Sequence, residues 1–220
     1  MPHDEAPPLT GCKPPKPTTF IGHFITLTPL DVDHDVAELY AISHGDDEAR
    51  ALWRYMPCGP FTDVAAHTTF LQQWVARPDV LAFTVRDAAS EQVLGSISIM
   101  SIRAEHGVAE LGNIWYAPSA QRTGANTEAC YLLLCHCFEH LRYRRMEWKC
   151  DSRNQRSRRA AERLGFTFEG IFRQHMIIKG ENRDTAWLAM LDTDWPRIGA
   201  AMKSRLFKNE PTANLSVAIG

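Results

Sequence analysis

Hydrophobic and polar positions follow two different periods along the chain, and each period predicts a different element. Strict alternation is typical of strands with one buried face. It predicts strands at 24–30, 80–87, 92–102, 107–117, 144–150, 166–178 and 184–191. Apolar positions three and four residues apart are typical of helices that cover such a sheet. They predict helices at 34–43, 64–76, 125–141, 154–165 and 195–206.

The order of these elements predicts an α/β (α+β) fold with a mixed, mostly antiparallel twisted sheet of about seven strands and helices on both faces. Short polar turns join the strands after residue 80, so these strands are expected to be antiparallel. A strand followed by a helix and another strand implies parallel neighbours with a right-handed crossover. Asp31 or Asp33 is expected to cap the first helix, and Thr62 or Asp63 the second.

The two ends of the chain depart from these patterns. Residues 1–18 hold six of the thirteen prolines and almost no periodic apolar positions, which predicts a flexible arm. Residues 19–207 are expected to form one domain, because their length suits a single sizeable core. Residues 208–220 are expected to be a tail.

Composition indicates the cellular compartment in which the protein is expected. The opening residues carry acids and prolines where an export signal has an apolar core, and no apolar run approaches the roughly 20 residues that span a bilayer. The six cysteines include no pair separated by two residues, so zinc-ribbon and thioredoxin-like classes lose their usual support. These features predict a cytoplasmic protein with reduced thiols and no membrane partner.

Charge is distributed unevenly, although the net charge is only −2. Residues 1–110 contain 7 Lys and Arg against 15 Asp and Glu, whereas residues 111–220 contain 17 against 11. This asymmetry favours an anionic ligand on the second half and a cationic one facing the first, or else two solvated faces. We expect the acids at 45–48 and Asp63 to favour cationic acceptors.

A small-residue turn separates the strand at 107–117 from the helix that follows it. The first turn of a helix has backbone N–H groups without partners and the positive end of its dipole, so it attracts anions. Gly124 lets the chain approach a ligand closely and tolerates unusual dihedral angles. Phosphate binding and plain helix capping both fit this turn, which consists of Gln121, Arg122, Thr123, Gly124, Ala125, Asn126 and Thr127.

A second segment favours phosphate binding. The stretch "NQRSRRAAERLGFTFEG" starts at Asn154, and together with "QRTGANTEA" it resembles the GNAT superfamily of acyl-CoA-dependent N-acetyltransferases. Within that superfamily the chain is most similar to the RimJ/RimL-like branch, named for enzymes that acetylate N-termini of ribosomal proteins. The segments "FITLTPLDVDHDVAELY" and "WLAMLDTDW" are also similar to that branch, so the resemblance covers about residues 20–205.

The resemblance implies a binding site for acetyl-CoA as co-substrate, with no metal. In this family the turn binds the CoA diphosphate through backbone amides, which maps onto Gln121, Arg122, Thr123, Gly124, Ala125, Asn126 and Thr127. Asn126 stands where the family pattern has Gly or Ala. The preceding strand opens away from its parallel neighbour and pantetheine lies in the gap, which implicates Ile114, Trp115 and Tyr116. Asn154 is expected to hold the pantetheine amide, and Ser157 to lie near the thioester sulfur.

Acetyl transfer to an amine needs a neutral nucleophile, so a general base or a water chain leading to one is expected. Glu110 is the first candidate, because some superfamily members carry a catalytic Glu 14 residues before the glycine of the turn. By alternation Glu110 is expected to share a strand face with Gly112, Ile114 and Tyr116. Ser157 is the candidate partner of the leaving thiolate. The usual tyrosine acid of the superfamily is replaced by Ala161.

Other chemistries are weighed against this one. "HCFEH", with His136 and His140 one helical turn apart, matches a zinc hydrolase pattern but has no evident third ligand. A cysteine nucleophile, Cys137 or Cys150, lacks an activating neighbour. The basic run 142–163 suits exposed helix charge or a CoA phosphate better than nucleic acid. The vacant tyrosine position leaves open a catalytically silent acyl-CoA-binding sensor.

The sequence therefore predicts an N-acetyltransferase that moves an acetyl group from acetyl-CoA to a primary amine by direct attack in a ternary complex. The acceptor is a small molecule or the N-terminus of a polypeptide. We expect no nucleic-acid partner, and the sequence is compatible with a monomer or a homodimer. The segment 31–78, which varies in such enzymes, is expected to set specificity.

Overall fold

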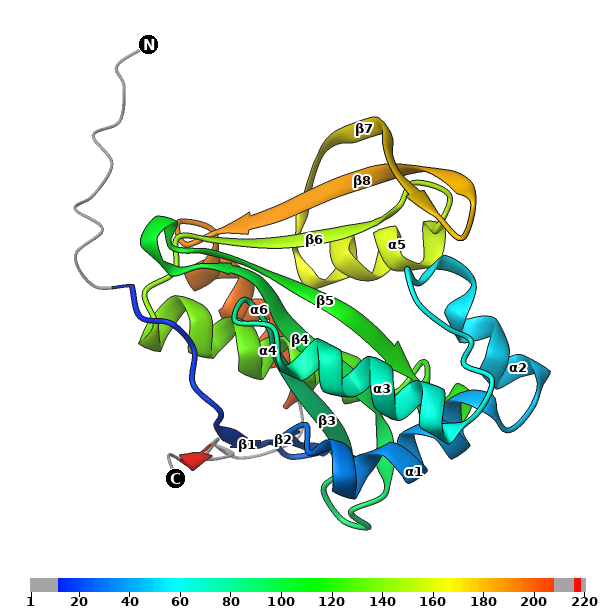
Figure 1. The fold of residues 1–220 in the computed structure, drawn as a ribbon. Helices are drawn as coiled ribbons and strands as arrows, with labels where there is room; N and C mark the ends of the chain where they lie inside the picture. Colours follow the sequence, from blue (N-terminus) through cyan, green and yellow to red (C-terminus); the bar gives the residue numbers. More distant parts are fainter. Residues whose placement is uncertain (1–11, 208–215, 219–220) are drawn as a thin grey trace.

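The computed structural model describes residues 12–207 and 216–218, and one twisted sheet of nine strands organises them (Figure 1). The strands are β1 (Thr19–Ile21), β2 (Ile25–Pro29), β3 (Leu81–Asp87), β4 (Val93–Arg103), β5 (Val108–Tyr116), β6 (Arg145–Asp151), β7 (Thr167–Ile178), β8 (Glu181–Leu191) and β9 (Ser216–Ala218). Their order across the sheet is β7-β8-β6-β5-β4-β3-β2-β1-β9. Only β5 and β6 are parallel neighbours among these strands. The predicted mixed, mostly antiparallel sheet is confirmed, and β1 and β9 extend it beyond the seven expected strands.

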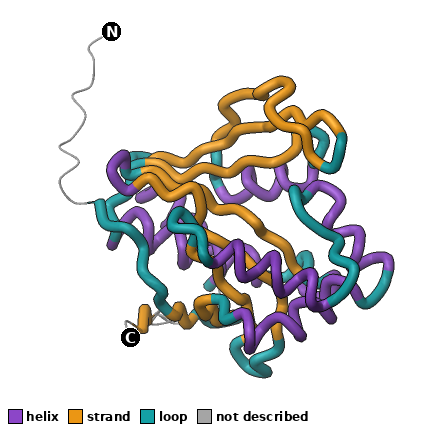
Figure 2. The backbone as a smooth tube through the Cα atoms, in the orientation of Figure 1, coloured by secondary structure: helices purple, strands orange, loops and turns teal. Residues whose placement is uncertain are grey.

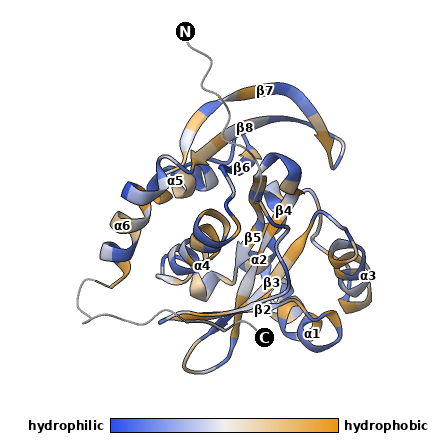
Figure 3. Cartoon of the chain, turned by 90° about the vertical axis from the view of Figure 1, so that its left-hand side faces the viewer, coloured by the Kyte–Doolittle hydropathy of each residue, from blue (hydrophilic) through white to orange (hydrophobic). Residues whose placement is uncertain are grey.

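Helices cover both faces of this sheet, as predicted (Figure 3). They are α1 (Val32–His44), α2 (Asp47–Arg50), α3 (Val64–Val75), α4 (Ala125–Cys135), α5 (Gln155–Leu164) and α6 (Trp195–Leu206), with short turns η1 (Ala51–Tyr55), η2 (Ala104–His106), η3 (Pro118–Ala120) and η4 (His136–His140). Two hydrophobic clusters fill the space between the layers. Leu133 of α4, Leu164 of α5 and Ile198 of α6 belong to the larger cluster. Leu39 of α1 and Leu71 of α3 belong to the smaller one.

The helix expected at 125–141 ends differently from its prediction. Regular α-helix stops at Cys135, and a π-helical turn, η4, continues to His140. The Leu141 N–H donates to the His136 carbonyl at 3.0 Å, one residue further back than in an α-helix. No helix in the described ranges is long and apolar enough to cross a membrane.

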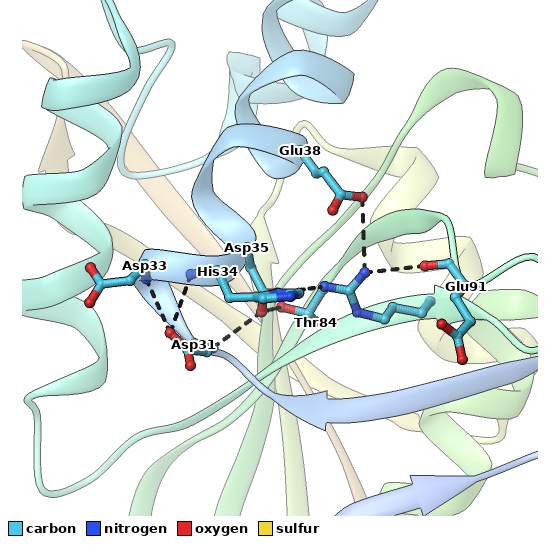
Figure 4. A network of polar contacts seen from close by, with 8 residues as sticks. Asp31, Asp33, His34, Asp35, Glu38, Thr84 and Glu91 are labelled. Carbon is cyan, nitrogen blue, oxygen red and sulfur yellow. Dashed lines mark hydrogen bonds and ion pairs between the residues drawn. The ribbon is translucent and has the colours of Figure 1, made fainter.

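A buried polar network fixes α1 to the sheet (Figure 4). Asp31 caps α1, and its carboxylate accepts from the N–H groups of the following residues. Asp35, only 2% exposed, accepts from Thr84 Oγ1 and from Arg86 Nη2, both at 2.5 Å. Burial alone would raise the pKa of Asp35, but hydrogen bonds from Thr84 and His34 and the charge of Arg86 leave that pKa below its ordinary value. The segment between α1 and β3 therefore starts from a helix that is firmly attached to the sheet.

Both ends of the described chain lie against the body. Residues 12–18, part of the expected flexible arm, form a loop that runs along one side of the molecule to β1 (Figure 2). Its start is tied down, since the Lys13 N–H donates to the Leu141 carbonyl at 3.2 Å and Cys12 Sγ to the Arg142 carbonyl at 2.9 Å. Residues 216–218, expected to be tail, form β9 beside β1. The rest of the predicted arm and tail, 1–11, 208–215 and 219–220, lies outside the described residues.

His67 of α3 is fully buried in the smaller cluster. Its ring stacks on Phe61 with centroids 4.6 Å apart. Neither ring nitrogen has a hydrogen-bond partner within the described residues. Burial, and secondarily the charge of nearby His44, lowers the pKa of His67 to about 4.

This histidine should make the fold sensitive to mild acid. The unfolded chain protonates His67 near pH 6.5 and the folded chain only near pH 4, so its contribution is fully present above pH 6.5 and is lost as the pH falls toward 4. At pH 5 the loss amounts to about 2 kcal/mol. Urea unfolding at pH 7 and pH 5 measures it. Between these pH values we expect the free energy of unfolding of His67→Phe to fall by about 2 kcal/mol less than that of the wild type. The exposed control His106→Gln should show the same fall as the wild type. Equal losses in His67→Phe and the wild type would contradict this account.

Candidate functional site

The two parallel strands separate partway along their length (Figure 1). β5 and β6 pair only from Val108 to Glu110 and from Arg145 to Glu147. Within the described chain they do not pair again, although β5 continues to Tyr116 and β6 to Asp151. Helix α4 follows β5 and helix α5 follows β6, so the N-termini of both helices lie toward the open end. The parted strand pair that the family resemblance implied is present.

A bulge in β5 accompanies the parting. Opposite Ile97 of β4, the strand β5 contains two residues, Asn113 and Ile114, because the register shifts between the pairs Ser96–Trp115 and Ser98–Gly112. Asn113 has φ 50°, in the left-handed region that Asn tolerates better than most residues. A bulge bends its strand and increases the local twist. The bulge therefore helps to turn β5 away from β6.

The bulge also corrects one of our expectations. Simple alternation would place Glu110 on the same face as Ile114 and Tyr116. Ala109, Leu111, Ile114 and Tyr116 instead contact the larger cluster, on the α4 side, so Glu110 lies on the opposite face from Ile114 and Tyr116. The extra residue inverts the alternation, and Trp115 packs into the smaller cluster.

The turn at Gln121–Thr127 presents backbone N–H groups at the start of α4. Here Arg122 adopts φ 64° and α4 begins at Ala125. In this stretch the N–H groups of Gln121 and Ala125 donate to protein acceptors. Within the described residues no acceptor is found for the N–H groups of Arg122, Thr123, Gly124, Asn126 and Thr127. A concave set of such donors at the positive end of a helix dipole suits a diphosphate.

Gly124 contributes in a different way from the one expected. Its φ of −71° is helical, so no unusual dihedral angle requires glycine here, and Arg122 takes the left-handed conformation instead. A Cβ at position 124 would meet only the Phe24 ring, at 3.6 Å. The protein therefore leaves room at this position for another side chain or for a ligand.

Two side chains connect the turn with the opposite side of the gap. Gln121 Nε2 donates to the Tyr116 carbonyl at 3.0 Å, which fixes the side chain under the turn. Arg156 of α5 donates through Nη2 to Gln121 Oε1. Its guanidinium therefore lies beside the turn and adds positive charge to it. The sequence placed Arg156 only within a basic run.

The start of α5 carries the other predicted ligand residues. Asn154 caps this helix, with its Oδ1 accepting from the Ser157 N–H at 3.0 Å. For its amide nitrogen no acceptor is found among the described residues, so this donor could meet a ligand carbonyl. Ser157 Oγ accepts from Trp148 Nε1 of β6 at 2.9 Å and also hydrogen-bonds with the Cys150 side chain, so the serine hydroxyl is held at the β6 edge of the gap.

Glu110 stands where the strands begin to part. It is 6% exposed, and its Oε2 accepts from Lys149 Nζ at 2.8 Å and from Ser101 Oγ at 3.2 Å. Lys149 also pairs with Glu147 at 2.9 Å and lies 4.3 Å from the centroid of the Trp187 ring. Glu110 Oε1 points along the strand toward Gly112. Sequence reasoning missed Lys149, because nothing in the pattern shows that it shares a buried cluster with Glu110.

The remaining candidates are in buried surroundings or have other partners. Ala161, at the vacant tyrosine position, is fully buried in the core. Cys137 is buried and Cys150 is 6% exposed, and burial raises the pKa of both thiols. The "HCFEH" stretch forms η4, where Glu139 accepts from Trp195 Nε1 at 2.7 Å. The described part of the chain contains no group of three His, Cys, Asp or Glu side chains that could hold a metal, so the zinc hydrolase alternative is unsupported.

Comparisons with known proteins agree with this arrangement. Residues 25–167 match the family model described as "Acetyltransferase (GNAT) domain". A GCN5-related N-acetyltransferase from Brucella melitensis superposes with a TM-score of 0.87 at 38% identity, covering 96% of this chain and 95% of the other. The Bacillus subtilis protein named "Putative ribosomal N-acetyltransferase YdaF" is 31% identical over 81% of this chain and 97% of its own length. RimJ of Mycobacterium smegmatis, solved with CoA-disulfide, shares the fold, with a TM-score of 0.73 at 22% identity over 86% of this chain and 94% of the other.

Proposed function

The chain belongs to the family of GNAT acetyltransferases, and from this premise we propose that it acetylates a primary amine by direct attack on acetyl-CoA in a ternary complex. It is an enzyme of the acyl-CoA-dependent N-acetyltransferase class, and it resembles the RimJ/RimL-like branch as predicted. One observation carries the proposal most strongly. Amides for which no acceptor is found among the described residues, those of Arg122, Thr123, Gly124, Asn126 and Thr127, follow a strand that has parted from its parallel neighbour.

We place the CoA diphosphate on the turn at Gln121–Thr127, with Arg156 adding charge from the other side. Pantetheine follows the open edge of β5 at Ile114, Trp115 and Tyr116. The side chains of Trp115 and Tyr116 are buried in the two clusters, so the backbone of these residues is the contact surface. The free amide group of Asn154 then meets a pantetheine carbonyl.

The transfer forms one bond and breaks another. The amine nitrogen attacks the thioester carbonyl carbon, the C–N bond forms, and the C–S bond breaks with its electron pair leaving on sulfur. The proton lost by the amine passes to Glu110, directly or through water. The Ser157 hydroxyl donates to the departing thiolate. Backbone N–H groups along the open β5 edge stabilise the oxyanion that develops on the carbonyl.

Acetyl transfer itself is measured with a panel of small amines and N-terminal peptides, with released CoA thiol as the readout. We expect thiol release that depends on both acetyl-CoA and an amine, together with an acetylated amine detected by mass. Binding of acetyl-CoA without release for any acceptor would contradict the proposal and would indicate the silent sensor instead.

Exchange of Glu110 for glutamine tests the general base. We expect Glu110→Gln to lower kcat by about 100-fold, because general base catalysis typically contributes that much. Glu147→Gln is the matched control, since Glu147 is the register partner of Glu110 and pairs with the same Lys149, but its carboxylate is also bound by Arg103 and Arg145. Equal kcat values for Glu110→Gln and Glu147→Gln would show that Glu110 is only a partner of Lys149.

A further inference from the structure

A cavity of about 310 Å³ lies where β6 ends. Its walls come from three segments far apart in the sequence, namely η1, the end of β6 and the turn between β7 and β8 (Figure 1). Lys179 Nζ donates to the Trp53 carbonyl at 2.7 Å and so holds the β7–β8 turn against η1. Asp151 lines the cavity, and Asn154, at the start of α5, follows three residues later. The cavity therefore lies at the β6 end of the gap, beside the start of α5, with room for a small molecule.

Positive charge exceeds negative charge in the cavity wall. Arg153 is neutralised, because it pairs with Asp151 at 2.9 Å and with Glu181 at 3.3 Å. The remaining cations of the wall are Arg54, Lys179 and Arg183. Within residues 12–207, none of these three makes an ion pair with a carboxylate. Both acids of the wall are thus already bound, and three cations have no carboxylate partner.

Arg183 is the most telling of the three. Its Nε is buried, and no acceptor for it is found among the described residues. A buried donor without an acceptor is costly, and a guanidinium presents a planar fork that matches a carboxylate. A ligand carboxylate in the cavity would supply the missing acceptor. The same carboxylate would meet the ammonium of Lys179, which the Trp53 carbonyl holds in place.

Two of the acids expected to attract a cationic acceptor cap helices. Asp46 caps α2 by accepting from the Ala49 N–H at 2.7 Å, and Asp63 caps α3 by accepting from the Ala66 N–H at 2.8 Å. Neither residue is part of the cavity wall. These two carboxylates are therefore not part of the cavity that we assign to the acceptor.

We infer that the acceptor is a small amine that carries a carboxylate, as an amino acid does, and that Arg183, Lys179 and Arg54 bind this carboxylate. The inference rests on the proposed function and adds a substrate class to it. The carboxylate occupies the cavity while the amine points past the end of β6 toward the thioester. The reaction stays the same, and the cations act by positioning the amine and by selecting acceptors.

Matched acceptor pairs test the inference. Amino acids and their carboxamides are compared by kcat/KM for thiol release, in the wild type, Arg183→Gln, Lys179→Gln and the exposed control Arg197→Gln. We expect the wild type and Arg197→Gln to prefer the carboxylate by about 10–100-fold, which is the range for hydrogen bonds to charged groups. In Arg183→Gln and Lys179→Gln the preference should shrink by at least tenfold, mainly through KM.

The outcomes separate this inference from the function beneath it. If none of the amines tested gave thiol release, the proposed function itself would be wrong. Release with carboxamides or acidic peptides equal to or better than free amino acids in the wild type would overturn the inference and leave the function standing. An unchanged preference in both variants would also overturn it. An acetyl-CoA affinity equal to that of the wild type shows that Arg183→Gln is folded. If Arg183→Gln does not fold, the carboxylate preference of Lys179→Gln tests the inference.

Discussion

Replacing Gly124 with aspartate is expected to weaken acetyl-CoA binding by about a hundredfold without unfolding the protein. A carboxylate at this position lies among the amides proposed to hold the diphosphate, and repulsion between like charges a few ångströms apart is worth about 2–3 kcal/mol in partly solvated surroundings. The backbone permits the change, because Gly124 has helical φ and a Cβ meets only the Phe24 ring at 3.6 Å.

Gly124→Asn is the matched control, since it has nearly the same shape without the charge. We expect its dissociation constant, measured by calorimetry, to stay within about fivefold of the wild type, and both variants to keep the wild-type free energy of unfolding within about 1 kcal/mol. The difference between the two variants should shrink at high salt. Equal affinities for Asp and Asn at low salt would place the diphosphate elsewhere.

Glu128 supports this turn from beneath, and its loss should cost about 3–5 kcal/mol of stability. It is fully buried in the first turns of α4. Its carboxylate accepts from the N–H groups of His23 at 2.7 Å, Phe24 at 2.7 Å and Ile25 at 3.0 Å, which attaches the β1–β2 turn to α4. In Glu128→Ala the buried N–H of Ile25 and the partly buried N–H groups of His23 and Phe24 lose their acceptor, and a buried unsatisfied donor costs about 1–3 kcal/mol.

Urea unfolding at neutral pH measures this loss. Glu162→Ala, on the exposed face of α5, is the control and should change stability by less than about 0.5 kcal/mol. Gly22→Ala should also destabilise, because a Cβ there would lie 2.6 Å from Glu128 Cδ. A Glu128→Ala variant as stable as the control would show that the three hydrogen bonds contribute nothing net.

The parts of the fold set by local patterns were predictable. Alternation located the long strands, and Asp31 and Asp63 cap the helices they were expected to cap. The strands missed, β1 and β9, are three residues each, too short for alternation to be visible. The parallel step from β5 through α4 to β6 followed from chain connectivity alone.

The details that shape the site depend on contacts between distant residues. The bulge at Asn113 inverted the face assignment after Gly112, although a Gly-Asn pair inside a strand is a signal that could have found it. Glu128 resembles an ordinary acid in the first turn of a helix, where negative charge is common. Its burial under the β1–β2 turn, 103 to 105 residues away in sequence, is a tertiary property.

Summed charge gives a different expectation of the acceptor from the one that the cavity supports. Asp46 and Asp63 of the first half cap helices and Asp35 belongs to a buried network, whereas the cavity wall contains cations from η1 and from the β7–β8 hairpin. Total charge does not show which side chains converge. The acceptor side of the site therefore had to be deduced from the structure.

Backbone amide NMR during an acetyl-CoA titration tests the central claim most directly. The account predicts that the largest shifts fall on the amides of Arg122, Thr123, Gly124, Asn126 and Thr127, with smaller ones at Asn154 and Ser157, and that they saturate with the dissociation constant found by calorimetry. Saturating shifts confined to other parts of the chain, with Arg122–Thr127 unmoved, would contradict it.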